Sequence, residues 1–197
     1  GGFARYSTDA YWLVPHFEKM LYDNALLARL YLHAHQATGR GMYRRITEET
    51  LDYILREMTG LEGGFFSATD ADSEGEEGKF FVWSPDEIEA VLGAEEAGIF
   101  NGFFGVRQGG NFEGKTILNI TQKASEYAQQ HGVDMDRLVD VVQRGKTALW
   151  AEREKRIHPL LDDKVLASWN GMMLRSFAEA GAALERQDYV DAAVKNA

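Results

Sequence analysis

Long helical segments of two kinds, buried and amphipathic, follow one another in two pairs along this 197-residue chain, and no other feature limits its fold so strongly. Residues 14–37 and 165–184 place apolar side chains on most sides of a helical wheel, which is typical of helices buried nearly all round. Residues 43–58 and 136–155 carry apolar side chains at three- and four-residue steps with charged residues between them, as expected of helices with one face in solvent. A buried helix is thus predicted beside an exposed one, twice.

Successive antiparallel helix hairpins would pair a buried helix with an amphipathic one in this way. The buried helices would form an inner ring and the amphipathic helices an outer ring. We therefore predict a mainly α fold, a partial α/α-toroid. A simple helix bundle and a solenoid of helix pairs are the alternatives. The chain begins at Gly1 without a methionine and ends inside a helical pattern, so residues 1–197 are expected to be an internal fragment of one toroid domain.

A small β-hairpin is predicted to interrupt the helical frame at about residues 63–83. Gly63–Ser67 and Lys79–Trp83 are expected as its strands, joined by an acidic turn that contains glycine. A capping serine and a proline then begin another helix. The elements predicted after the hairpin are a helix from Ser84 to about Leu92, a helix at 95–104 and an extended segment at 111–120.

Gly-Gly pairs recur near a following phenylalanine, at residues 1–2, 63–64 and 109–110. Their spacing is irregular. We interpret them as a weak repeat that marks tight turns at one end of successive hairpins.

Composition excludes several classes of function. The chain has no cysteine, which removes thiolate catalysis and disulfides, and its 31 acidic and 21 basic residues give a net charge of −10 that disfavours nucleic acid as a partner. No apolar run approaches the roughly 20 residues that cross a bilayer, so no membrane partner and a cytoplasmic location are expected. Neither a serine-hydrolase elbow nor a nucleotide-binding glycine loop is present, and no cofactor or metal is indicated.

Polar residues gather near the start of the first buried segment. Arg5 and Tyr6 precede it, and Asn24 follows. On one helix, His16, Lys19 and Asp23 would share a face at three- and four-residue steps. A buried helix tolerates such groups when they pair with one another or face a cavity. The cluster is thus either a structural network or the lining of a pocket.

The acidic segment 70–78 begins like a calcium loop, with Asp70, Asp72 and Glu74 at positions one, three and five. Position twelve would be Phe81, so an EF-hand is not favoured, although another cation site remains an alternative. Paired carboxylates are also what sugar chemistry requires as acid and base or nucleophile. The structural alternative is an acidic turn that is simply solvated.

A third cluster opens the second buried helix. Asp162 or Asp163 could cap that helix. Trp169 and Asn170 follow about two turns in, and an indole beside amide and carboxylate groups suits stacking and hydrogen bonding of a sugar ring. The capping and binding interpretations are compatible.

Three long motifs, in order, resemble the spermatogenesis-associated protein 20 and bacterial YyaL family. They are residues 1–7 with 12–25, residues 70–80, and residues 162–171. The resemblance implies a region similar to six-hairpin glycosidases and to sugar epimerases, in a longer protein that also carries a thioredoxin-like domain. The family supplies no assigned reaction, and a likeness of fold does not establish chemistry.

Our leading hypothesis is a carbohydrate-active domain, hydrolase or epimerase-like, with its pocket at the toroid centre. It names Asp70, Asp72 and Asp163 as acids or bases, and His16 with Asp23 as a proton-transfer or orienting pair. Its substrate contacts are Arg5, Tyr6, Asn24, Trp169 and Asn170. The competing hypothesis is a non-catalytic toroid that binds a small ligand or protein and serves the thioredoxin-like domain. The expected partners are a carbohydrate or another small molecule and the rest of a longer chain, and the fragment alone is expected to be inactive.

Overall fold

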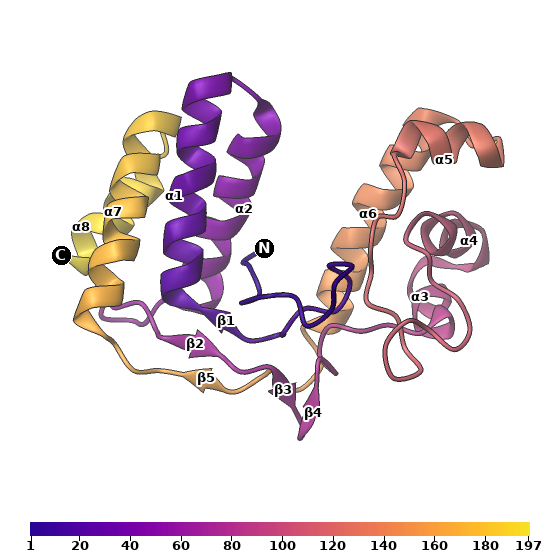
Figure 1. The fold of residues 1–197 in the computed structure, drawn as a ribbon, viewed down its shortest axis with the longest axis horizontal. Coiled ribbons are helices and arrows are strands. Elements are labelled where there is room, and N and C mark those ends of the chain that lie inside the picture. Colours follow the sequence, from indigo (N-terminus) through magenta and orange to yellow (C-terminus); the bar gives the residue numbers. More distant parts are fainter. The chain divides into compact units, whose positions relative to one another are not determined.

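A computed structural model describes all of residues 1–197 and divides them into two compact units. The first unit comprises Gly1–Ser7, Pro15–Asp72 and Pro159–Ala197, and the second comprises Thr8–Val14 and Ser73–His158. Eight helices and five two-residue strands make up the chain (Figure 1). The mainly α class with a small β-hairpin is confirmed, whereas a toroid remains a prediction.

Four helices form the first unit, in two hairpins. α1 (Leu21–Thr38) turns back into α2 (Gly41–Glu57), and α7 (Ala167–Leu184) turns back into α8 (Gln187–Asn196). α1 lies beside both α2 and α7, as Figure 1 shows. Two helix hairpins that are distant in sequence therefore pack through their first helices.

Small residues on α1 let its neighbours approach closely. Ala25 and Ala28 are fully buried, and the backbone carbonyl of each accepts a hydroxyl from another helix. Ser176 of α7 donates to Ala25 at 2.8 Å, and Thr47 of α2 donates to Ala28 at 3.3 Å. The two hydroxyls are satisfied in the core by these bonds, so they fix α1 against both partners without leaving a buried polar group unpaired.

The expectation that the first long helix is buried nearly all round is wrong. Leu26 is 54% exposed and Leu30 is 60% exposed, so one face of α1 is open in this chain. The helix also begins at Leu21, seven residues later than the apolar pattern indicated. Apolar composition alone could not separate an uncovered apolar face from a covered one.

A three-stranded sheet gathers the segments that lead into α1 and α7. β2 (Ala68–Thr69) lies between β1 (Lys19–Met20) and β5 (Leu161–Asp162), and both pairings are antiparallel. Ala68 is opposite Met20 on one side and Asp162 on the other. The sheet thus ties together three loops at the amino-terminal ends of α1 and α7.

The second unit contains the other four helices around its own aromatic core. They are α3 (Pro85–Leu92), α4 (Ala94–Phe103), α5 (Ala124–His131) and α6 (Met135–Arg153). Ser84 and Glu87 form the predicted capping box, with Ser84 accepting from the Glu87 amide and the Glu87 carboxylate accepting from the Ser84 amide. Phe100 and Phe104, with ring centres 4.5 Å apart, lie in the core that these helices enclose.

The predicted strands in and after the hairpin are not formed as such. Within 63–83, the hairpin is β3 (Asp72–Ser73) paired with β4 (Glu76–Glu77), which lies in the segment expected to be its turn. The aromatic segments on either side make only single bridges, from Phe65 to Thr59 and from Trp83 to Thr116. Their aromatic side chains instead fill the two cores, which explains why they have a strand-like composition.

A buried asparagine near the start of α1 and another near the start of α7 each hold a Gly-Gly-Phe loop. Asn24 accepts a hydrogen bond from the Phe3 amide at 2.6 Å and donates to the Phe3 carbonyl at 3.2 Å. Asn170 does the same with Phe65, at 2.8 Å and 2.9 Å. Each asparagine is the fourth residue of its helix. We call this arrangement the asparagine clamp.

The two clamps belong to equivalent repeats. In each, the held phenylalanine stacks on an aromatic ring seven residues after the asparagine: Phe3 on Tyr31 at 5.6 Å, and Phe65 on Phe177 at 5.2 Å. The third Gly-Gly pair, at residues 109–110, lies in a turn of the second unit, where Phe112 bridges to Lys115. Two of the three predicted repeats are therefore equivalent hairpin loops, and the third is not.

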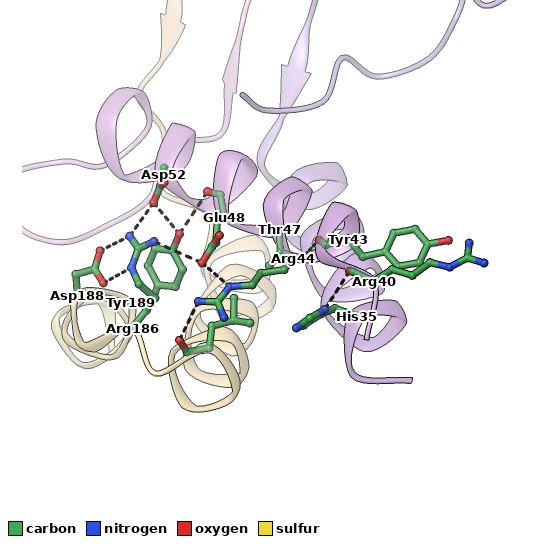
Figure 2. Close-up of polar contacts among 11 residues, drawn as sticks. His35, Arg40, Tyr43, Arg44, Thr47, Glu48, Asp52, Arg186, Asp188 and Tyr189 are labelled. Carbon is green, nitrogen blue, oxygen red and sulfur yellow. Dashed lines mark hydrogen bonds and ion pairs between the residues drawn. The ribbon is translucent and has the colours of Figure 1, made fainter. Parts of the chain in front are cut away.

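A polar network centred on Arg186 joins α2 and α8 (Figure 2). Its guanidinium donates to Asp188 at 2.6 Å and to Asp52 of α2 at 3.0 Å. Tyr189 donates its hydroxyl to the same Asp52 carboxylate at 2.7 Å, and burial raises the pKa of this hydroxyl. The network joins the turn between α7 and α8 to α2, so it has a structural role away from the strands.

Glu179 on α7 should make the protein sensitive to acid. Hydrogen bonds from Arg29 of α1, and from Arg175 and His33, lower the pKa of this carboxyl from 4.5 to about 2. A lowered carboxyl pKa adds stability at pH values above 4.5 that is lost as the pH falls through about 2. We expect Glu179→Gln to be less stable than wild type at neutral pH, with the difference shrinking towards pH 2 in chemical unfolding. A constant difference across that range would contradict the assignment.

The Gly63 loop should tolerate no side chain. Gly63 has φ of +94°, and a Cβ there would lie 2.8 Å from the Lys195 carbonyl oxygen. Gly75 also has a positive φ, +77°, but a Cβ there meets nothing within 4 Å. We expect Gly63→Ala to destabilise the fold by about 2–4 kcal/mol and Gly75→Ala by about 1 kcal/mol, measured by urea unfolding. Equal losses would show that backbone conformation alone matters at Gly63.

Candidate functional site

A β-ladder, and not a helix, carries the first cluster of candidate residues. The Arg5 amide donates to the Glu18 carbonyl at 3.0 Å, the His16 amide donates to the Tyr6 carbonyl at 2.8 Å, and Ser7 bridges to Pro15. The prediction that His16, Lys19 and Asp23 share one helical face is therefore wrong. The backbone groups of this segment are used by the ladder, and Pro15 has no amide to donate.

Ion pairs and ring stacking join the side chains of this ladder. The Arg5 guanidinium donates to a Glu18 carboxylate oxygen at 3.0 Å, and His16 Nδ1 lies 3.8 Å from that same oxygen. The imidazole of His16 stacks on Tyr6, with ring centres 4.9 Å apart. His16 Nδ1 is buried and makes no hydrogen bond, and the Glu18 carboxylate is the charged group beside it.

Asp23 in the first turn of α1 extends the cluster. Burial raises the pKa of the Asp23 carboxyl, opposed by the positive charge of Arg5 and supported by the negative charge of Glu18. The carboxyl therefore holds a proton more readily than a solvated aspartate does. A carboxyl with a raised pKa beside a second, ion-paired carboxylate is an arrangement typical of acid–base sites.

Aromatic rings supply the apolar part of the cluster. Tyr22 of α1 packs edge-on against Trp169 of α7, with ring centres 4.8 Å apart. Tyr22 also hydrogen-bonds to Arg5, which helps to raise the pKa of that guanidinium after the larger effect of Glu18. The cluster thus spans α1 and α7. We define it as Arg5, Tyr6, His16, Glu18, Tyr22, Asp23 and Trp169.

Two predicted substrate contacts have a structural role instead. Asn24 is fully buried and Asn170 is 6% exposed, and the amide nitrogen of each donates to two backbone carbonyls. Both amide oxygens accept bonds as well, in the asparagine clamps described above. Both asparagines were selected because they are polar residues on mostly apolar helices. That pattern does not show whether the side chain contacts a ligand or holds a loop.

The predicted acids Asp70, Asp72 and Asp163 are exposed residues, and the structure does not bring them into the ion-pair and aromatic contacts of the cluster. Asp70 accepts only a local hydrogen bond from the Asp72 amide, at 3.3 Å. Neither Asp162 nor Asp163 caps α7, whose N-cap is Leu166. Asp162 instead binds Lys164, whose hydrogen bond lowers the pKa of the Asp162 carboxyl.

No three histidine, aspartate or glutamate side chains are grouped so that they could hold a metal ion. This includes the acidic turn, where Glu74 and Glu76 both pair with Lys79. The carboxylates of Glu74 and Glu76 therefore belong to a local ion-pair network with Lys79.

Glu18 and Tyr22 are members of the cluster that sequence reasoning did not select. Glu18 stands two residues after His16, and residues two apart lie on the same side of an extended strand. Because we predicted this segment as a helix, Glu18 was not expected on the same side of the chain as His16. Tyr22 adjoins Asp23, but only the packing of α1 against α7 brings it to Trp169.

Comparison with known proteins finds relatives along the whole chain. Human spermatogenesis-associated protein 20 is 35% identical across 100% of the chain, and the mouse protein is 34% identical. The chain is homologous to part of spermatogenesis-associated protein 20. An uncharacterised Caenorhabditis elegans protein is 31% identical across 98% of the chain. The chain spans 28% of the length of the human and mouse relatives, and the resemblance inferred from the three motifs is confirmed.

Other comparisons add little. The sequence matches no protein-family model. A crystal structure of D-mannose isomerase aligns with the whole chain and 44% of its own chain, at 13% identity and a TM-score of 0.35, which is too low to support a conclusion. None of the eight helices is both long enough and apolar enough to cross a bilayer.

Proposed function

We propose that the cluster performs acid–base chemistry on a carbohydrate, with Asp23 as the proton-transferring group. The observation that carries this proposal is the Asp23 carboxyl, whose pKa is raised by burial beside the ion pair of Arg5 and Glu18. A carboxyl with a raised pKa is better suited to act as a general acid than a solvated aspartate is.

The side chains around Asp23 favour a sugar over other small molecules. Tyr6, Tyr22 and Trp169 supply aromatic surface, and Arg5 with His16 supplies hydrogen-bond donors, a combination suited to a ring with apolar faces and a polar edge. The net charge of −10 disfavours phosphorylated ligands and nucleic acid. A neutral sugar carries no phosphate group, so the negative charge of the protein does not disfavour it.

In this mechanism each side chain has a distinct role. Asp23 donates a proton to a sugar oxygen. In hydrolysis this is the glycosidic oxygen, whose bond to the anomeric carbon breaks while water adds to that carbon and gives up a proton to His16. In epimerisation it is the carbonyl oxygen of the open-chain sugar, while His16 removes the proton from the adjacent carbon. Arg5 holds Glu18 in place through their ion pair, and the positive charge of Arg5 limits how far burial raises the pKa of Asp23. His16 is the second proton carrier in this proposal, because its Nδ1 makes no hydrogen bond within the fold.

The reaction can be sought without knowing the substrate. The intact protein is incubated in D2O with a panel of aldoses, ketoses and N-acetylhexosamines, and with chromogenic glycosides. Proton NMR then reports deuterium incorporation or a new sugar, and absorbance reports hydrolysis. Turnover of any member supports the proposal. Inactivity toward the whole panel, together with measurable sugar binding, would instead favour a non-catalytic binding domain.

The proposal extends to the setting of this chain in a larger protein. Its relatives are more than three times as long as the part that the chain matches. We include the rest of such a chain, with the thioredoxin-like domain that the resemblance implies, as the partner of this helical region. The carbohydrate reaction and the pocket at a toroid centre both belong to that intact protein.

A further inference from the structure

Tyr11 and Trp12 form an unusual surface feature in the segment Thr8–Val14 of the second unit. Their side chains are 91% and 86% exposed, so neither contributes to a core. No other pair of neighbouring aromatic residues in the chain is exposed to this degree. We define the aromatic tip as these two residues on the turn Asp9–Leu13.

The turn that presents the aromatic tip is held by specific hydrogen bonds. The Asp9 carboxylate accepts from the Tyr11 amide at 2.6 Å, from the Leu13 amide at 3.1 Å, and also from the Val14 amide. Thr8 closes the base of the turn through its amide and its hydroxyl, which both donate to the Val14 carbonyl. The exposed rings are therefore mounted on an ordered turn.

The backbone at Trp12 has a strained conformation, which the hydrogen bonds of this turn maintain. Its φ is +59°, in the left-handed region that a bulky side chain rarely adopts. Glycine would be the ordinary residue there. Because the side chain of Trp12 is exposed, packing in a core does not account for this strained conformation. The conformation therefore points to a role for Trp12 in contacting another molecule.

We propose that the aromatic tip is a carbohydrate-contact surface, on which Trp12 and Tyr11 stack against a sugar ring. The choice of a sugar as the ligand rests on the proposed function. Size favours a sugar over a protein partner, since two aromatic side chains offer about 150–250 Å² each, whereas a standard protein interface takes roughly 800 Å² from each side. The excess of acidic residues disfavours stacked nucleobases.

The test uses maltotriose, cellotriose and mannotriose as probes, with saturation-transfer NMR to detect contact and titration to measure affinity. We expect at least one probe to bind the intact protein, Trp12→Gly to weaken that binding about tenfold, and Trp12→Phe to retain most of it. Trp150→Ala, at the 41% exposed tryptophan of α6, should leave binding unchanged. The unfolding midpoint of Trp12→Gly should be equal to or above that of wild type, because glycine relieves the positive φ.

Three results would overturn the proposal. One is that no probe binds the wild-type protein, and another is that Trp12→Gly binds as wild type does. The third is a clear fall in the unfolding midpoint of Trp12→Gly, which would make Trp12 a structural residue. Asp23→Asn separates this inference from the proposed reaction, since it should abolish turnover while leaving binding at the aromatic tip intact.

Discussion

Asn170→Ala is expected to destabilise the protein by about 3–5 kcal/mol. The substitution removes the acceptor of the Phe65 amide and the donor to the Phe65 carbonyl, both of which are buried. Asn196 also loses its bond to the Asn170 amide oxygen. Leaving buried backbone groups unpaired costs more free energy than the same hydrogen bonds contribute when they are formed. We therefore expect the Phe65 loop and the start of α7 to become less ordered together.

Urea unfolding of three variants separates this explanation from a loss of packing. Asn170→Asp keeps the shape but replaces the donating nitrogen with an oxygen, so it should destabilise the protein about as much as Asn170→Ala. Asn24→Ala should show a similar loss, because its clamp on Phe3 has the same bonds. Asn119→Ala, at a residue without a side-chain hydrogen bond, is the control. A loss below about 1 kcal/mol for Asn170→Ala would show that the Phe65 loop is held by other contacts.

Asp23→Asn is expected to lower kcat/KM at least 100-fold on whichever sugar proves to be the substrate, since acid–base groups contribute about 10²–10⁴ to rate. The amide has the same shape but transfers no proton. The limb of the pH–rate profile that reports the raised pKa of Asp23 should disappear with it. Steady-state kinetics across pH, with protein stability measured in parallel, check both expectations.

The control for Asp23→Asn is the same change at Asp136, an exposed residue in the first turn of another helix, α6. Asp136→Asn should leave the kinetics unchanged. If Asp23→Asn retains more than about a tenth of the activity, Asp23 is not the proton carrier. His16→Gln and Glu18→Gln would then be the next variants, because these residues complete the cluster.

The long helices could be predicted from sequence because their apolar spacing reflects a local, repeating geometry. α2, α6 and α7 lie within two residues of the predicted bounds, and the capping box at Ser84 was read directly from its residues. The start of α1 was missed because apolar residues in the ladder before it continue the same pattern. Only the pairing with Tyr6 and Ser7 shows that this segment is extended.

Part of the candidate site could also be predicted, for a different reason. Arg5, Tyr6, His16, Asp23 and Trp169 were selected as polar or aromatic groups near helix starts, and the structure joins them in one cluster. Asn24 and Asn170 were selected by the same rule but hold loops. Whether a buried amide meets a ligand or a backbone depends on a loop elsewhere in the sequence, so local pattern cannot decide it.

The most direct test of the central claim is the pKa of Asp23 itself, measured from the carboxyl carbon shift of the intact protein as pH is varied. The account predicts a titration midpoint above the ordinary value of 3.8. It also predicts a lower midpoint in Glu18→Gln, because that change removes a negative charge and frees Arg5 to act on Asp23. A wild-type midpoint at or below 3.8 would contradict the account, since Asp23 would then be an ordinary ion-paired carboxylate and not a proton donor.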